Sequence, residues 1–476
     1  MLESVIVVGA GLSGLVAAYR LQRAGVEVHV IEAAPRPGGV IGSVRHEETG
    51  VLFERGPNSG MDITPAINAL LDDLGIRALR IDGSAASSRR YVVRDGRLMA
   101  LPMSPGAFLR TPLFSGAAKL RLCAEPFIRR APAGVEESVA QFVQRRLGRE
   151  FLDYAIEPFV AGIYAGDPQR LSVPAAFPKL HALEQRYGSL IGGAIRGARE
   201  RRRSAERGKN AAASFSFRDG MQTLTDALAA ALRHIECGTR AIRLARESDG
   251  SYRLDVQLAD HTESRRAGAV VLAVPAHAAA ELAREMIPQA AESLAAIPYA
   301  PVAVVISAYR RTDVAHPLDG FGFLAPAVER PAVLGTLFSS SMFEHRADAD
   351  TVLLTSFVGG LRNPAMTEAP DDALRQSVCR ELERLVGARG TPVLTEIIRW
   401  PRAIPQYTLG HLQRIAVLER AERDFPGLYF RANYRGGVSI GDCIRNGIAT
   451  AEAVAARSTG AAVHVANEHR SASPMP

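Results

Sequence analysis

The strongest constraint on the fold is a segment near the start of the chain that passes from an apolar strand through three glycines into a helix. Val5–Val8 is short, β-branched and free of polar side chains, which is typical of a parallel strand buried on both faces. It is followed by Gly9-Ala10-Gly11-Leu12-Ser13-Gly14, the G-x-G-x-x-G pattern. In such a loop Gly9 permits the tight turn, Gly11 lets the backbone approach a pyrophosphate, and Gly14 lets the helix lie against the sheet.

The residues after the glycines complete a dinucleotide-binding unit. Residues 15–24 have helical periodicity with Gly25 as a C-cap, and residues 27–31 read as a second strand that ends at Glu32. Glu32 stands where a Rossmann fold places the acceptor for a ribose hydroxyl. A glycine-rich turn in an unrelated α/β unit would leave this carboxylate without a role. The order of elements therefore predicts a bound dinucleotide, with its diphosphate at the helix N-terminus.

A second pair of glycines favours FAD over a nicotinamide coenzyme. Arg36-Pro37-Gly38-Gly39 lies just beyond the second strand, where flavoproteins of the two-dinucleotide-binding type bring backbone and an arginine against FAD. Near the other end, Leu428–Phe430 and the glycine-rich run 432–444 repeat the order strand, turn and helix, so a second helix N-terminus is expected to face a phosphate or the flavin. No cysteine or histidine is placed for covalent attachment, and we expect noncovalent FAD.

Composition narrows the class of protein. A chain of 476 residues is too long for one core and predicts about three domains. The four cysteines have no paired spacing and the eleven histidines no ligand-like pairs, which argues against a disulfide framework and a metal site and favours a reducing, cytoplasmic location. The chain starts directly with the first strand, leaving no room for a targeting segment, and no apolar run is long enough to span a membrane.

The net charge of +7 is concentrated in one segment, residues 196–210. Its basic residues are Arg196, Arg199, Arg201, Arg202, Arg203, Arg207 and Lys209, opposed only by Glu200 and Glu206. A solvated or disordered loop is one interpretation, and contact with anionic lipid is the other. Nucleic acid is disfavoured because no aromatic platform accompanies the cluster.

The order of patterns along the chain predicts a discontinuous domain organisation. Residues 89–98 predict a hairpin with an Asp95-Gly96 turn, and from 101 to 197 the strand signal disappears. Residues 102–130 mix apolar side chains with Arg and Lys and no acidic rim, so this region either lies on a membrane or packs on the protein itself. Strand patterns return near residues 240–246, 252–258, 269–274 and 302–357.

The chain resembles the FAD-dependent protoporphyrinogen and coproporphyrinogen oxidases, within the monoamine-oxidase-like flavoproteins, to about residue 456. The glycine motifs are shared in form with amine oxidases and carotenoid desaturases. The more specific segments are Arg90-Tyr91, Ala165-Gly166-Asp167-Pro168, Gly320-Phe321-Gly322, Ile404-Pro405-Gln406-Tyr407-Thr408-Leu409-Gly410-His411 and Asp442-Cys443-Ile444. The resemblance implies oxidation of a porphyrinogen to a porphyrin in three two-electron steps, each followed by reoxidation of FAD by oxygen with release of hydrogen peroxide. It also implies a homodimer.

The resemblance assigns site residues one by one. Arg90 matches an arginine that binds a substrate propionate, Phe321, Leu324 and Phe357 match apolar residues that sandwich the macrocycle, and Gly162 matches a glycine beside it. Val438, Ser439 and Ile440 fall in the turn that contacts FAD. Without the resemblance, Arg90 would be a surface arginine and the apolar residues plain core. Asn58 departs from the arginine that some members have there. No catalytic acid or base is assigned, and His411 is interpreted as structural.

We therefore expect an α/β plus α+β protein in three parts. A Rossmann-type FAD domain comprises residues 1–82, 217–280 and 425–460, a mixed-sheet substrate domain comprises 83–90, 199–216 and 281–424, and a helical membrane-facing domain comprises 91–198. Residues 461–476 are expected to be disordered. The favoured substrate is protoporphyrinogen, because Arg90 is the one recognisable cation at the pocket, whereas coproporphyrinogen carries four propionates. Coproporphyrinogen oxidase, an amine oxidase or desaturase, and a flavin-binding scaffold protein remain the alternatives.

Overall fold

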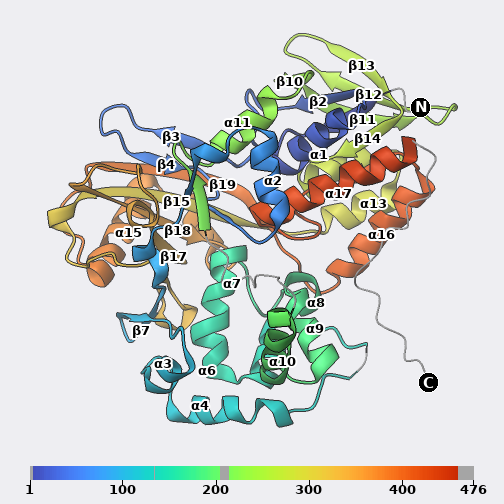
Figure 1. Ribbon diagram of the computed structural model, residues 1–476. Coiled ribbons are helices and arrows are strands. Elements are labelled where there is room, and N and C mark those ends of the chain that lie inside the picture. Colours follow the sequence, from blue (N-terminus) through green and yellow to red (C-terminus); the bar gives the residue numbers. More distant parts are fainter. Residues whose placement is uncertain (1–3, 133, 204–213, 459–476) are drawn as a thin grey trace.

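The computed structural model describes residues 4–132, 134–203 and 214–458. The expected tail 461–476 and residues 204–210 of the basic segment lie outside these ranges, and the side chains of 198–203 are likewise not described. Figure 1 shows a region of mostly parallel strands and helices that contains both described ends of the chain, a larger sheet beside it, and a group of helices below both.

A five-stranded parallel sheet forms around the first strand. Its order is β10 (Ile235–Cys237), β2 (Val28–Glu32), β1 (Val5–Val8), β14 (Ala269–Leu272) and β20 (Leu428–Phe430). Successive residues of β1 enter two different cores, Val5 and Val7 on one face and Ile6 and Val8 on the other. Burial on both faces explains why this strand contains no polar side chain, as the sequence predicted.

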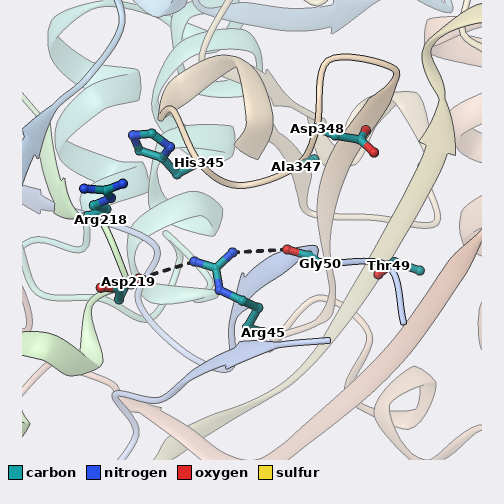
Figure 2. A pocket seen from close by; sticks show the side chains of 8 residues that line it. All are labelled: Arg45, Thr49, Gly50, Arg218, Asp219, His345, Ala347 and Asp348. Carbon is teal, nitrogen blue, oxygen red and sulfur yellow. Dashed lines mark hydrogen bonds and ion pairs between the residues drawn. The ribbon is translucent and has the colours of Figure 1, made fainter. Parts of the chain in front are cut away.

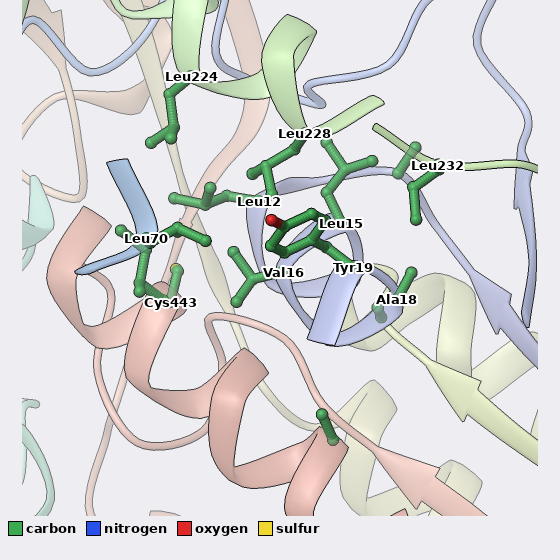
Figure 3. Close-up of a cluster of buried hydrophobic side chains, with 14 of the residues drawn as sticks. Leu12, Leu15, Val16, Ala18, Tyr19, Leu70, Leu224, Leu228, Leu232 and Cys443 are labelled. Carbon is green, nitrogen blue, oxygen red and sulfur yellow. The ribbon is translucent and has the colours of Figure 1, made fainter. Parts of the chain in front are cut away.

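Two helices cover one face of this sheet. α1 (Leu12–Arg23) and α17 (Ile440–Ser458) pack on each other, and Gly447 lies so close to Val16 that a Cβ there would come within 2.8 Å of it. The shared core also includes α2 (Pro65–Asp73) and α11 (Gln222–Ala230) (Figure 3). The opposite face packs against α12 (Ala276–Ala283), α13 (Pro288–Ala295) and a small sheet of β11 (Arg240–Arg246), β12 (Tyr252–Gln257) and β13 (Thr262–Ala267).

The second large sheet has seven strands and is mixed. Its order is β19 (Leu394–Pro405), β15 (Tyr299–Arg310), β18 (Thr351–Gly359), β17 (Gly335–Phe338), β16 (Gly322–Leu324), β7 (Tyr91–Arg94) and β8 (Arg97–Ala100). Only the β16 and β7 pair is parallel. α15 (Asp371–Val386) packs on one face through its buried side chains.

The predicted hairpin at residues 89–98 is present as β7 and β8. Asp95 and Gly96 both have positive φ, 51° and 70°, which is the requirement of a two-residue type I′ turn. However, this hairpin extends the seven-stranded sheet, although the expected boundary at 90/91 put it with the helices. The reason is the pairing of Tyr91 with Phe323, a long-range contact that no local pattern reveals.

The shorter strands tie distant segments together. β3 (Ser43–Arg45) pairs with β4 (Leu52–Glu54), and β9 (Ser214–Phe217) lies between β5 (Gly60–Met61) and β6 (Arg80–Asp82). Residues 214–216 were expected in the substrate domain, yet they pair with strands from the first 82 residues. Strand pairing across more than a hundred residues again explains the difference.

Among residues 101–132 and 134–203, regular structure is helical, as the loss of strand signal predicted. The helices are α3 (Pro105–Arg110), α4 (Gly116–Cys123), α5 (Val139–Arg146), α6 (Arg149–Phe151), α7 (Glu157–Tyr164), α8 (Val173–Ala176), α9 (Pro178–Tyr187) and α10 (Leu190–Arg203). Arg146, Glu125 and Glu184 form a buried ion-pair cluster at their centre, with exposures of 0%, 0% and 1%. α7 contacts the seven-stranded sheet, and it therefore brings the helical region against β16.

Candidate functional site

The glycine loop leaves open space where the sequence predicts a pyrophosphate. Gly9 has φ +104°, and a Cβ there would lie 2.8 Å from the carbonyl oxygen of Ala273. A Cβ on Gly14 would lie only 2.1 Å from the carbonyl oxygen of Gly9. By contrast, a Cβ on Gly11 would have no neighbour within 4 Å. Gly9 and Gly14 are therefore needed for packing, whereas Gly11 borders a space that a ligand can enter.

The N-terminus of α1 is suited to an anion. Gly11 is its N-cap, no side chain caps it, and its first turn contains no acidic residue. α17 differs, because Ser439 accepts a hydrogen bond from the Asp442 N–H at 3.2 Å and Asp442 lies in the first turn. Since unpaired N–H groups and the helix dipole attract negative charge, the N-terminus of α1 is better suited to a diphosphate than that of α17.

Glu32 lies beside the glycine loop, as its spacing predicted. One carboxylate oxygen accepts a hydrogen bond from the Ala10 N–H at 2.7 Å, and the other accepts from the Ala34 N–H at 2.8 Å. A carboxylate has about four acceptor positions, so these contacts orient the group and leave capacity for a ribose hydroxyl.

The second glycine pair packs against the first. The Gly38 N–H donates to the Ala10 carbonyl at 2.8 Å, and a Cβ on Gly39 would lie 3.4 Å from the Cα of Gly11. Arg36 donates to the carbonyls of Pro37 and Ile41 at 3.0 and 2.8 Å, which closes its own loop. The structure thus brings Gly38 and Gly39 to Gly11, while Arg36 acts on the backbone of the loop.

The closing turn reaches the same edge of the sheet. Val438 and Ser439 end the connection from β20, Ile440 is the first residue of α17, and Ser439 also donates to Asp442 at 2.7 Å. Cys443, one turn into α17, is buried with its thiol hydrogen-bonded to Ser13 of α1, and burial raises the pKa of Cys443 to about 11. The N-termini of α1 and α17 therefore lie side by side (Figure 3).

A buried tyrosine and histidine lie under the closing turn. Tyr407 accepts a hydrogen bond from the Gly437 N–H at 2.9 Å and donates to the Asn433 carbonyl at 2.7 Å. Its ring stacks on His411 with centroids 4.2 Å apart. His411 Nε2 donates to the Tyr434 carbonyl at 3.0 Å, and burial lowers the pKa of His411 to about 4. His411 is therefore neutral at pH 7 and holds backbone.

These features fit FAD. The open side of Gly11, the uncapped N-terminus of α1 and the acceptor capacity of Glu32 lie together, because Glu32 bonds Ala10 of the glycine loop. A dinucleotide needs a diphosphate site beside a ribose acceptor, and these residues supply both.

The predicted substrate residues come together in two groups. Arg90 is exposed beside β7, and its guanidinium lies over the ring of Phe321 at 5.2 Å from the centroid. Leu324 of β16 and Phe357 of β18 lie in the same row of the seven-stranded sheet, since each is paired in register with Gly335 of the strand between them, β17. A Cβ on Gly162 of α7 would lie 2.8 Å from Leu324 Cδ2, so α7 meets the sheet at this leucine.

Gly335 was not recognised in the sequence. A Cβ on Gly335 would lie only 2.6 Å from the Phe323 carbonyl oxygen and 3.3 Å from Leu324 Cδ2, so the missing side chain lets β16 and β17 approach closely here. A glycine within a strand pattern that marks a close approach was the available signal. Tyr407 was likewise quoted only as part of a motif. Asn58, the departure from the family pattern, hydrogen-bonds the Gly56 carbonyl at 3.2 Å within its own turn.

A separate cavity of about 400 Å³ lies over β3 and the start of the β9 to α11 connection (Figure 2). It is lined by Arg45, Thr49, Gly50, Arg218, Asp219, His345, Ala347 and Asp348. Arg45 is already paired with Asp219 at 3.4 Å and with the Gly50 carbonyl at 3.1 Å. Arg45 and Arg218 are matched there by Asp219 and Asp348, and none of the predicted site residues lines this cavity.

Among residues 4–132, 134–203 and 214–458, no cluster of three His, Cys, Asp or Glu side chains is arranged to hold a metal ion. Within that part of the chain, no helix has the length and apolar character needed to cross a bilayer.

Comparison with known proteins agrees with the site. Residues 12–455 match the family model described as flavin containing amine oxidoreductase. The chain is 36% identical over 95% of its length to protoporphyrinogen oxidase 2, chloroplastic/mitochondrial, of Arabidopsis thaliana, and covers 94% of that protein. It is 28% identical over 94% of its length to coproporphyrinogen III oxidase of Bacillus subtilis, of which it covers 96%.

A solved structure has the same fold. The protein of Exiguobacterium sp. 255-15, provisionally named protoporphyrinogen oxidase, superposes with a TM-score of 0.79 at 26% identity, over 95% of this chain and 99% of the other. The flavin-binding edge and these matches lead to one assignment. The chain belongs to the protoporphyrinogen and coproporphyrinogen oxidases among the flavin-containing amine oxidoreductases, and it is an FAD-dependent oxidoreductase.

Proposed function

We propose that this enzyme oxidises protoporphyrinogen IX to protoporphyrin IX with oxygen as the electron acceptor. The observation that carries the proposal is the 36% identity, over nearly the whole chain, to a plant protoporphyrinogen oxidase. Six electrons and six protons leave the macrocycle in all, and three molecules of oxygen become three of hydrogen peroxide. FAD, when bound, supplies the acceptor for each hydride.

The residues of the chain bind and orient the macrocycle. Arg90 offers a guanidinium for one propionate, and Phe321 lies against that guanidinium. Leu324 and Phe357 offer an apolar wall on the two sides of Gly335. Positioning against such a wall suffices for hydride transfer, because the cofactor carries the difficult step. No acid or base of the chain is required by this proposal.

Protoporphyrinogen is favoured over coproporphyrinogen on charge. Coproporphyrinogen has four propionates, each of which is costly to desolvate without a cationic partner. Arg90 is the cation assigned to the pocket, while the assigned neighbours Phe321, Leu324 and Phe357 are apolar. Arg94, close in sequence, is already paired with Glu150 at 2.6 Å. The less polar substrate therefore suits these residues better.

The test measures kcat/KM on both porphyrinogens with the FAD-loaded enzyme, following porphyrin fluorescence and hydrogen peroxide. We expect at least a tenfold preference for protoporphyrinogen, which corresponds to about 1.4 kcal/mol. A preference for coproporphyrinogen would refute the proposed substrate but would leave the proposed reaction class, porphyrinogen oxidation, intact. Turnover of amines or polyenes without porphyrinogen oxidation would refute both, and bound FAD with no turnover would favour a scaffold protein.

We also propose that the helical region forms a separate domain that contacts an anionic membrane. Met103, Leu109, Leu120 and Phe127 project from and around α3 and α4 with exposed fractions of 72%, 68%, 74% and 88%. These helices lie far from the parallel sheet in Figure 1. Arg110 is exposed at the end of α3, as expected for a face that combines apolar and cationic side chains at a lipid surface, whereas Lys119 of α4 donates to the carbonyls of Leu109 and Thr111.

Flotation with vesicles of phosphatidylcholine and phosphatidylglycerol tests this contact. Wild type should float at low salt and float less at high salt, since the charges are screened. Leu120→Glu with Phe127→Glu should abolish flotation. Ile242→Glu is the matched control, because Ile242 is 46% exposed on β11, outside the helical region. Equal flotation of both variants would contradict the proposal.

A further inference from the structure

Tyr407 lies where three parts of the chain meet. It follows the end of β19 in the seven-stranded sheet, and its carbonyl accepts a hydrogen bond from the Ser172 N–H of the helical region at 2.8 Å. Its side chain is 2% exposed and its hydroxyl bonds the turn before α17. This residue therefore touches the substrate sheet, the helices and the flavin-binding region at once.

The turn that Tyr407 bonds contains two glycines with positive φ and is also bonded from α17, where Asn446 donates to the Arg435 carbonyl at 2.9 Å. Gly436 and Gly437 have φ of +76° and +119°, values that L side chains rarely adopt and that glycine adopts without restriction. The Tyr407 hydroxyl donates to the Asn433 carbonyl at 2.7 Å and accepts from the Gly437 N–H at 2.9 Å. One hydroxyl thus fastens both sides of the turn immediately before Val438.

The hydroxyl itself is held rigidly. The ring stacks on His411 at 4.2 Å and an interplanar angle of 11°, and His411 is bonded to the Tyr434 carbonyl. Burial raises the pKa of Tyr407, so that the hydroxyl keeps its proton and can donate. His411 and Tyr407 therefore form one stacked support whose two ends both bond backbone between 433 and 437.

We infer that Tyr407 is a positioning residue for the flavin: its hydroxyl sets the place of the turn at Val438, Ser439 and Ile440, and thereby the affinity and environment of bound FAD. The inference deepens the proposed function, but its test follows the cofactor and needs no porphyrinogen. Failure of porphyrinogen oxidation and failure of this inference can therefore be told apart.

The test compares Tyr407→Phe with Tyr434→Phe in the full-length protein. Tyr434 is a matched control, because it is also fully buried in the same segment, yet among the described residues its hydroxyl has no hydrogen-bond partner. FAD is titrated into each apo protein, and the visible circular dichroism of the bound flavin is recorded. We expect Tyr407→Phe to raise the Kd for FAD about tenfold, for two lost hydrogen bonds, and to change the flavin spectrum.

Tyr434→Phe should leave the Kd within about twofold, since no hydrogen bond is lost. A Tyr407→Phe protein that melts at a lower temperature, but binds FAD with unchanged Kd and spectrum, would reduce Tyr407 to a structural role and overturn the inference. If this variant does not fold, His411→Leu provides the second test: it keeps the hydroxyl, removes the ring beneath it, and should raise the Kd about threefold in the same direction. An unchanged Kd and spectrum in folded His411→Leu would then overturn the inference.

Discussion

Removal of the Arg146 charge should loosen the helical region and leave the cofactor in place. Arg146 donates to Glu125 at 3.1 Å, to Glu184 at 2.5 Å and to the Ile128 carbonyl at 3.0 Å. Glu125 in turn accepts from the Leu190 and Ile191 N–H groups, which begin α10. The ion-pair cluster therefore connects α5, α9 and the start of α10 through groups that water does not reach.

The magnitude follows from burial. Breaking a buried pair by removing one partner costs about 3–5 kcal/mol, because an uncompensated charge is left behind. In Arg146→Met, Glu184 remains paired with Arg145 at 2.9 Å, so the charge left without a partner is mainly that of Glu125. We therefore expect the free energy of local opening to fall by about 3 kcal/mol, the lower end of that range. This corresponds to roughly 100-fold faster amide exchange.

Hydrogen exchange at residues 190 and 191 measures this effect locally, and flavin content is recorded in parallel. Arg149→Met is the matched control, since Arg149 is 65% exposed in an i,i+4 pair with Asp153 and should change exchange less than about threefold. Adding Glu125→Gln to Arg146→Met should recover part of the loss, because the unpaired charge disappears. If Arg146→Met exchanges no faster than Arg149→Met, the reasoning from buried charge is refuted.

Four further variants test the site. Gly11→Val should fold, because its Cβ meets open space, yet bind no FAD; normal flavin content would contradict the pyrophosphate assignment. Glu32→Ala should weaken FAD binding by about 1.5–3 kcal/mol in titrations of the apo protein, and an unchanged Kd would remove Glu32 from the site. Arg90→Ala should raise KM more than it lowers kcat in steady-state assays, whereas an unchanged KM would place the propionate elsewhere. For His411, the pKa of about 4 lies below the ordinary 6.5, so the unfolded chain takes up a proton first. The contribution of neutral His411 to the free energy of unfolding is complete above pH 6.5 and falls by up to about 3 kcal/mol as the pH drops to 4. Chemical denaturation should show this pH dependence in the wild type and not in His411→Leu.

The cofactor half of the protein could be predicted because its signals are local. β1, the glycines, α1, β2 and Glu32 lie within one continuous stretch, and each role follows from a near neighbour: Glu32 bonds Ala10, and Gly14 packs on Gly9. Even there α1 begins at Leu12, three residues before the predicted start, because Gly11 already serves as its N-cap. β13 was missed, since an edge strand with every second side chain exposed resembles a loop.

The pairing of distant strands could not be predicted in the same way. Hairpin residues 91–100 belong to the seven-stranded sheet only because β7 pairs with β16, and β9 joins β5 and β6 across a gap of more than a hundred residues. Hydrophobic alternation says that a strand has a buried face, but it does not say which strand is its neighbour. Domain boundaries drawn from sequence order therefore shift wherever the sheet closes over a long distance.

The substrate wall shows the same limit at single residues. Leu324 and Phe357 were assigned by resemblance, each as an isolated apolar side chain, and core packing would have explained either one. In the fold they lie on the two sides of Gly335, which stands in register with both. Gly162 then brings α7 against Leu324 from the other region. Both glycines are close approaches, because a Cβ at 162 would lie 2.8 Å from Leu324 Cδ2 and a Cβ at 335 would lie 2.6 Å from the Phe323 carbonyl oxygen. The two positions therefore fix where Leu324 lies, and no single-residue pattern reveals this. Gly335→Ala should displace Leu324 and so raise the KM for the macrocycle more than the Kd for FAD.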